Sequence, residues 1–174
     1  MSYTENSVTV TAAKPAYVTV KDLQATLPNK DNFIVQVDMS AIHSKATLAK
    51  GGQGLVLGNC IIRLNRDTLG ISQSGKLTNY APHATDESLK IPTLPNGIGW
   101  TVDTKPYTFI VKGYKVENQM KLDILVKVDG VETLINTVNI NDLGSTEILY
   151  YSYVDGLGSN MTTTFSNLTT KVYQ

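Results

Sequence analysis

Three tyrosines lie close together in the segment ILYYSYV, at Tyr150, Tyr151 and Tyr153. If this segment is a β-strand, successive side chains point to opposite faces, so Tyr151 and Tyr153 share the face that Tyr150 does not. With Tyr150 directed into the core, two phenol rings lie on an outer surface. Such rings can stack on the apolar face of a sugar ring. Cross-strand packing of the tyrosines on one another is the alternative interpretation.

Other side chains of this chain have the chemistry that a sugar needs around such rings. Trp100 follows Gly97-Ile98-Gly99 in a segment rich in chain breakers. Exposed there, its indole would be a further stacking platform, and buried there it would anchor the loop; both readings stay open. Polar groups on strand-like segments can bind sugar hydroxyls or simply be solvated. The candidates are Arg63, Gln36, Asp38, Asp123 and Tyr114.

The position of these polar residues relative to the tyrosines is also predicted. Lys112, Tyr114 and Asp123 lie on segments with strand alternation. We expect their strands to neighbour that of Tyr151 and Tyr153, so that all of them line one concave outer surface. The sequence thus predicts a single carbohydrate-binding face.

A cation site is the second chemical possibility. The loop from Asp155 to Asn160, DGLGSN, offers a carboxylate, an amide oxygen and free carbonyls, which are the ligand types of calcium. Only one carboxylate is local, so a structural turn is the alternative. His43 and His83 have no Cys, Asp or Glu at zinc-ligand spacing. Apart from this calcium, no cofactor is expected.

Catalytic motifs are absent from the sequence. A glycosidase needs two carboxyls at a defined separation. A pair built from different strands, such as Asp38 with Asp123, is a minor alternative. There is no G-x-S-x-G elbow, and Gly51-Gly52-Gln53-Gly54 lacks the Lys-Ser/Thr ending of a phosphate-binding loop and is read as a flexible turn. We therefore expect no enzyme. The glutamates are mutually distant in sequence: Glu5, Glu87, Glu117, Glu132 and Glu147.

The elements that must position these residues are strands. Short apolar alternations recur with turn residues between them, and Asp129-Gly130 between two such runs is a strong hairpin signal. Residues 40–54 are expected to form an irregular crossover, and the breaker-rich residues 81–106 a long loop. The pattern predicts an all-β, antiparallel β-sandwich with little or no helix. One domain over residues 1–174, with its core at about 7–173, is expected from the length.

The composition of the chain limits the classes of partner that we expect it to bind. Fifteen basic and fifteen acidic residues give zero formal net charge, which favours a neutral ligand over nucleic acid or an anionic membrane. Cys60 is the only cysteine and lies in a strand-like context, so we expect a small buried hydrophobic residue. The N-terminal residues carry no signal-peptide pattern, and no apolar run has transmembrane length.

The order of motifs in the second half resembles a known superfamily. YTFIVKGYK is followed by KLDILVKVDG, then DGLG, then TFSNLTTKVY. This order is similar to the concanavalin A-like and laminin-G-like jelly rolls, over about residues 33–173. The E-x-D-x-E pattern of the superfamily's glucanases is not present. Calcium near the rim of the sandwich is frequent in these relatives.

The resemblance implies a non-catalytic carbohydrate-binding module, like those of glycoside hydrolases and phage tails. Its ligand would be an oligosaccharide or a cell-surface or cell-wall polysaccharide. A role in phage or bacterial adhesion, on the virion or outside the cell and within a larger chain or assembly, is the setting that it implies. The alternative is a structural or protein-binding assembly domain of a virion tail or an adhesin, because fold does not fix function. A glycoside hydrolase is the least favoured reading.

Overall fold

The computed structural model describes the backbone of residues 2–4, 7–13, 16–21, 25–43, 50–65, 69–80, 106–155 and 160–174. Side chains are described for residues 7–12, 25–42, 52–64, 69–76, 106–154 and 160–174. Every regular element within these ranges is a β-strand, which confirms the all-β prediction. The described part of the chain contains no helix long and apolar enough to cross a membrane. The predicted loop lies outside the described residues, except for Pro106.

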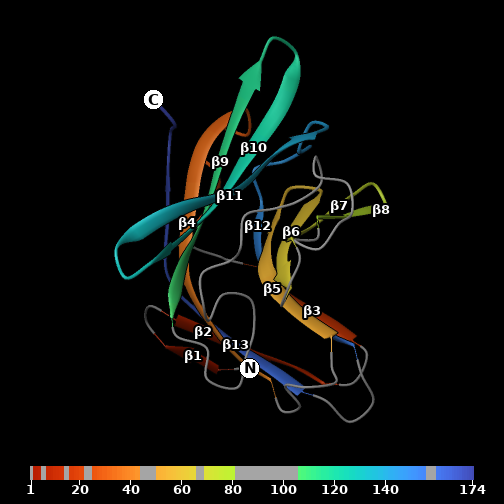
Figure 1. The fold of residues 1–174 in the computed structure, drawn as a ribbon, viewed down its shortest axis with the longest axis vertical. Helices are drawn as coiled ribbons and strands as arrows, with labels where there is room; N and C mark the ends of the chain where they lie inside the picture. The colour runs from red at the N-terminus through yellow and green to blue at the C-terminus, as the bar shows by residue number, and fades with distance from the viewer. Residues whose placement is uncertain are drawn as a thin grey trace.

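Two antiparallel sheets pack face to face as a jelly-roll sandwich (Figure 1). Sheet A has seven strands, in the spatial order β1 (Ser2–Thr4), β2 (Ser7–Ala13), β13 (Asn160–Lys171), β4 (Asn32–His43), β9 (Tyr107–Val116), β10 (Gln119–Val128) and β11 (Val131–Ile140). Sheet B has six, in the order β3 (Ala16–Lys21), β12 (Ile148–Asp155), β5 (Lys50–Leu57), β6 (Cys60–Asn65), β7 (Leu69–Gln73) and β8 (Lys76–Tyr80).

The core lies between the sheets and follows from strand alternation. In β4, every second residue is buried while its neighbours are partly exposed, as the period of two requires. Tyr150 of β12 is buried as expected, and its ring lies 4.7 Å from that of Phe165 in β13. Cys60 is fully buried, and burial raises the pKa of its thiol to about 12. The thiol is therefore protonated at neutral pH and belongs to the core, as predicted.

The Asp129-Gly130 hairpin is confirmed. Both residues have positive φ, 50° and 82°, which is the geometry of a tight primed turn. Gly130 adopts it without the steric cost of a side chain. The turn fixes the pairing of β10 with β11 from Val128 opposite Val131 onward.

The expected crossover over residues 40–54 is wrong at both ends. β4 continues to His43, and β5 begins at Lys50, so Gly51-Gly52-Gln53-Gly54 is strand rather than a flexible turn. Glycine is disfavoured in strands, which explains the misreading. These glycines pair in register with β12 and β6. The hydrogen bonds to these two strands hold the segment extended, although glycine itself has a low preference for strands.

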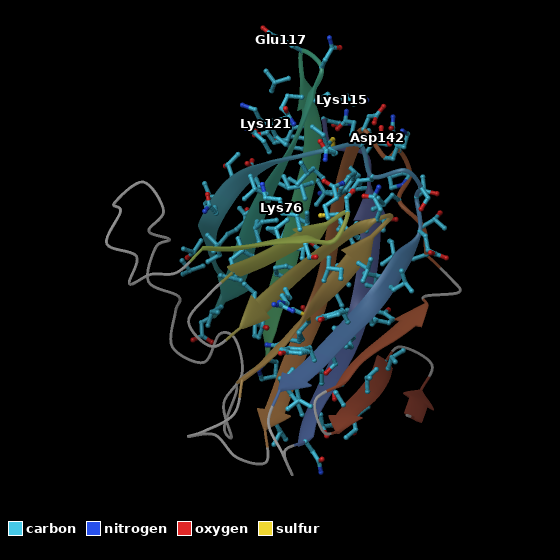
Figure 2. All side chains as sticks on the ribbon, turned by 90° about the vertical axis from the view of Figure 1, so that its right-hand side faces the viewer. Lys76, Lys115, Glu117, Lys121 and Asp142 are labelled. Carbon is cyan, nitrogen blue, oxygen red and sulfur yellow. The ribbon has the colours of Figure 1, made fainter. Side chains whose placement is uncertain are left out.

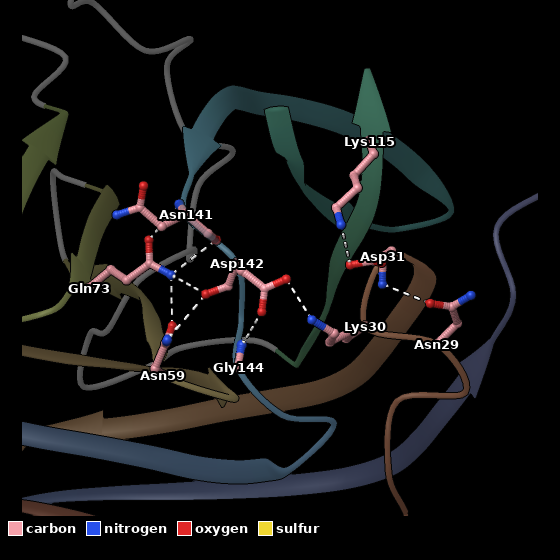
Figure 3. A network of polar contacts seen from close by, with 9 residues as sticks. All are labelled: Asn29, Lys30, Asp31, Asn59, Gln73, Lys115, Asn141, Asp142 and Gly144. Atoms are coloured by element: carbon pink, nitrogen blue, oxygen red, sulfur yellow. Dashed lines mark hydrogen bonds and ion pairs between the residues drawn. The ribbon is translucent and has the colours of Figure 1, made fainter. Parts of the chain in front are cut away.

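A polar network ties sheet B to the segment that links β11 with β12 (Figure 3). The amide of Gln73 is its centre. Its Nε2 donates to Asn59 Oδ1 at 2.7 Å and to the carbonyls of Asn141 and Asp142 at 3.1 and 3.2 Å, and its Oε1 accepts from the Asn141 amide at 2.8 Å. One side chain therefore fixes the point at which the chain passes from sheet A to sheet B.

Replacement of Gln73 by Glu is expected to destabilise the protein by about 1–2 kcal/mol. The carboxylate keeps the acceptor for the Asn141 amide but sets a negative oxygen against three acceptors. Urea unfolding at neutral pH measures the loss. Near pH 3 the carboxyl is largely protonated and can donate again, so the difference from the wild type at that pH should shrink. Equal stability at neutral pH would contradict this role of Gln73.

The same network ends in an ion pair, with Lys30 Nζ 2.5 Å from Asp142 Oδ2. The hydrogen bond from Lys30, followed by that from the Gly144 amide, lowers the pKa of Asp142 below its ordinary 3.8. The hydrogen bond to Asp142 raises the pKa of Lys30 above its ordinary 10.5.

This pair is expected to contribute its full stabilisation between the two ordinary pKa values, 3.8 for Asp142 and 10.5 for Lys30. Its contribution is lost as pH falls through the lowered pKa of Asp142, because the carboxylate is then neutralised. It is also lost as pH rises through the raised pKa of Lys30. The difference in thermal midpoint between wild type and Lys30→Gln should be small, since the pair is on the surface, and largest in this window. A difference that does not decline as pH falls below the ordinary pKa of Asp142 would contradict the assignment.

Candidate functional site

The candidate site lies on the outer face of sheet B, which is turned toward the viewer in Figure 2. Strand register brings residues from three neighbouring strands into one row: Tyr151 of β12 is opposite Gly54 of β5, which is opposite Arg63 of β6. In the next row, Tyr153 is opposite Gly52. We call these five residues the tyrosine–arginine site.

Glycines make the site possible. Because Gly52 and Gly54 have no side chains, nothing on β5 stands between the tyrosines of β12 and Arg63 of β6. The Arg63 side chain crosses this strip and reaches both tyrosines. Its Nη1 donates to the Tyr151 hydroxyl at 3.3 Å, and its Cζ lies 5.0 Å from the centre of the Tyr153 ring. The second contact is a cation–π interaction, worth about 0.5–2 kcal/mol depending on desolvation.

Arg63 is held in place without being saturated. A guanidinium has five N–H donors, and the contact with Tyr151 is its only hydrogen bond to the described residues. Its Nε is buried and has no hydrogen-bond partner. No described carboxylate pairs with Arg63, since the ion pairs found there involve other residues. The group is thus positioned by aromatic rings and keeps donors for another acceptor.

The two tyrosines differ in access. Tyr151 lies on the outer face as predicted, but it is only 3% exposed, so it is not the open stacking platform that the sequence suggested. Tyr153 is partly exposed. The structure therefore assigns different positions to them: Tyr151 supports Arg63 from within the face, and Tyr153 offers ring surface at its edge.

The prediction of one face shared with Tyr114 and Asp123 is wrong. Those residues lie on β9 and β10 of sheet A, whereas Tyr151 and Tyr153 belong to sheet B, so the two groups are on opposite sides of the sandwich. The alternation of side chains shows which residues of a strand share a face, but it does not show which strands become neighbours in a sheet. Lys112, placed beside them by the sequence, is on β9 and pairs with Glu132 at 2.9 Å.

The candidate sugar-binding residues Tyr114, Asp123 and Asp38 form hydrogen bonds within sheet A. Asp123 Oδ1 accepts from the Tyr114 hydroxyl at 3.1 Å and from Thr137 Oγ1 at 2.7 Å. Partial burial, together with the Asp123 charge, raises the pKa of Tyr114 above its ordinary value of 10, so its hydroxyl remains a donor. Asp38 accepts from Thr108 at 2.6 Å and from Asn167 at 2.8 Å.

Gln36 lies on β4 in the same sheet A, paired with Ile110 of β9 and not beside the tyrosines. A binding role for the sheet A candidates stays a prediction. Of the seven predicted carbohydrate-binding residues that the structure describes, Arg63, Tyr151 and Tyr153 meet on sheet B, whereas Tyr114 and Asp123 meet on sheet A.

Two predicted features lie wholly or largely outside the described residues. Trp100 lies outside the described residues. In the tentative calcium loop, residues 156–159 and the side chain of Asp155 are also outside them, and Asn160, at the start of β13, is exposed. Within the described ranges, no three His, Cys, Asp or Glu residues gather as metal ligands would. The calcium site stays a prediction.

Sequence reasoning missed Gly52 and Gly54. A signal was available, since the larger Gln53, Leu55 and Leu57 alternate with Gly52, Gly54 and Val56, which is the period of a strand; the structure buries all six residues. Gly54 has a further requirement. A β-carbon on it would lie 2.0 Å from the Ile62 carbonyl oxygen and 2.9 Å from the Arg63 Cα. Only glycine fits this place.

Comparison with known proteins gives the fold but no family. Neither a family model nor a curated protein matches the sequence. Among solved structures, a functionally unknown protein from Saccharomyces cerevisiae aligns with 99% of this chain and 91% of its own, at 13% identity and a TM-score of 0.58. A legume lectin-like domain from Entamoeba histolytica aligns with 99% of this chain and 86% of its own, again at 13% identity and a TM-score of 0.58.

The chain has a concanavalin A-like jelly-roll fold. The fold resemblance stated from the motifs is thereby confirmed. At 13% identity the likeness concerns the fold alone. A CBM2 module of the evolved Dit protein of Lactobacillus casei BL23 phage J-1 is also similar, at 11% identity over 87% of this chain and 68% of that module. Its TM-score of 0.41 is too low to support a conclusion.

Proposed function

We propose that this protein binds a saccharide on the outer face of sheet B, at the tyrosine–arginine site, without cleaving it. The observation that carries the proposal is the joint position of Tyr153 and Arg63 across a strip of glycines. A sugar needs an aromatic surface for its apolar face and fixed polar groups for its oxygens. Tyr153 offers the first, and Arg63 the second.

The flat backbone of β5 is the third part of the argument. Gly52 and Gly54 are buried, and because they have no side chains the Arg63 side chain can lie across β5 and reach both tyrosines. Arg63 is already oriented by Tyr151 and Tyr153, so binding costs little additional ordering of its long side chain. A preorganised donor beside a ring suits recognition of a rigid, hydroxylated ring.

Binding rather than hydrolysis is proposed because the sequence lacks the paired-carboxylate pattern of the superfamily's glucanases, whereas a glycosidase uses two carboxyls. The lectin-like name of one structure with this fold agrees with such a function but is not evidence about the ligand. A cell-wall or cell-surface polysaccharide as the ligand, a virion or extracellular setting and a role in adhesion stay predictions of the sequence.

The test begins with a panel of polysaccharides and bacterial cell walls, with and without EDTA, followed by NMR on the isotope-labelled protein with the best binder. Saturable shifts at the amides of Gly52, Gly54 and Tyr153, and at the Arg63 side chain, are the expected result. Shifts confined to the outer face of sheet A would overturn the location. An absence of binding across the panel would overturn the function and favour the alternative of an assembly domain.

A further inference from the structure

The charge on Arg63 carries an inference about the ligand, which rests on the proposed function. The outer face of sheet B contains ten residues whose side chains are described, and Arg63 is the only charged one. They are Gly52, Gly54, Val56, Ile61, Arg63, Gly70, Ser72, Leu149, Tyr151 and Tyr153.

An uncharged sugar does not need a cation in such a place. Arg63 is partly buried, and its hydrogen-bond and cation–π partners among the described residues are a hydroxyl and a ring, neither of which neutralises its charge. Removing a charged group from water without a counter-charge is unfavourable, and a charge-assisted pair is the usual compensation. Two surface lysines show the contrast, because Lys30 pairs with Asp142 and Lys115 pairs with Asp31 (Figure 3).

We infer that the saccharide bound here is acidic and that its anionic group pairs with Arg63. A carboxylate or sulfate presents several oxygens in one plane or cluster, and the planar guanidinium can donate to two of them at once. The Nη atoms are the donors for this contact, because Nε is enclosed. The adjacent Tyr153 ring then lies where the sugar ring that carries the acidic group can stack.

The zero net charge of the protein is compatible with an acidic ligand. Net charge governs long-range attraction and the rate of encounter, whereas a guanidinium with no ion-pair partner among the described residues acts at contact distance. The sequence favoured a neutral ligand on net charge alone. A cation that has no ion-pair partner among the described residues, on a face whose other described side chains are uncharged, predicts selectivity for acidic sugars without strong attraction to polyanions such as nucleic acid.

Matched pairs of polymers test the inference. Polygalacturonate, alginate and hyaluronan are each compared with their carboxyl-reduced forms, and dextran sulfate is compared with dextran, by titration calorimetry at low and at physiological salt. We expect the wild type to bind at least one acidic form about tenfold more tightly than its neutral partner. A carboxylate ligand and a sulfate ligand are distinguished by which pair shows the preference.

Variants then assign the preference to Arg63. In Arg63→Gln the ratio between acidic and neutral forms should fall to within about threefold, and Arg63→Lys, which keeps the charge but loses the planar fork, should give an intermediate ratio. Thermal midpoints verify that both variants are folded. A preference that survives in Arg63→Gln, or a wild type that binds neutral polymers equally well, overturns the inference and leaves saccharide binding intact. If no polymer of either kind binds, both proposals fail.

Discussion

Replacing Tyr153 by Ala is expected to lower the affinity for the saccharide by about tenfold or more, which corresponds to ~1.4 kcal/mol. The substitution removes the ring surface offered to the sugar and also the ring that lies 5.0 Å from the Arg63 guanidinium. Arg63 would then keep only its contact with Tyr151 and lose orientation. Titration calorimetry with the best binder from the polysaccharide panel measures the effect.

Two control variants make the result specific. Tyr153→Phe keeps the ring, so its loss of affinity should stay below about threefold if stacking carries the effect. Tyr173→Ala removes a partly exposed tyrosine of comparable size that lies beyond the end of β13 and packs 5.7 Å from Tyr114 of sheet A. It should leave binding unchanged. A loss in Tyr173→Ala equal to that in Tyr153→Ala would place the binding surface elsewhere.

Gly54→Ala is expected to destabilise the protein by about 3 kcal/mol, because the added methyl group cannot be accommodated. Its carbon would lie 2.0 Å from the Ile62 carbonyl oxygen, which belongs to the backbone of β6 and has little freedom to move. β5 and β6 would have to separate at the pair that places Arg63 beside the glycine strip. Urea unfolding gives the loss of stability, and saccharide binding should be weakened in the fraction that remains folded.

Gly130→Ala is the matched control, because its loss of folding stability should come from backbone conformation alone. Gly130 has a φ of 82°, and nothing lies within 4 Å of the position that its β-carbon would take. A loss of about 1 kcal/mol is therefore expected there, from strain without a clash. If the two variants lost the same stability, steric exclusion at Gly54 would not be the cause.

The sequence alone determined the class of fold. Alternation of buried and exposed residues has a period of two, so the strands around Phe33, Phe109 and Leu122 and the direction of Tyr150 follow from local pattern. The Asp129-Gly130 hairpin follows from local backbone preference, since few residue pairs accept positive φ at both positions. The order of these motifs also agreed with the concanavalin A-like fold. These features depend on interactions between near neighbours in the chain.

Only the tertiary structure decided which residues form the site. Arg63 and Tyr151 are separated by 88 positions in sequence and meet because β6, β5 and β12 are neighbours in sheet B. Tyr114 and Asp123, which carry the same kinds of groups, are in sheet A and bind each other. Strand order depends on long-range pairing that no local pattern encodes. For the same reason, Gly52 and Gly54 read as a flexible turn in the sequence and become, between two partner strands, the strip that Arg63 crosses.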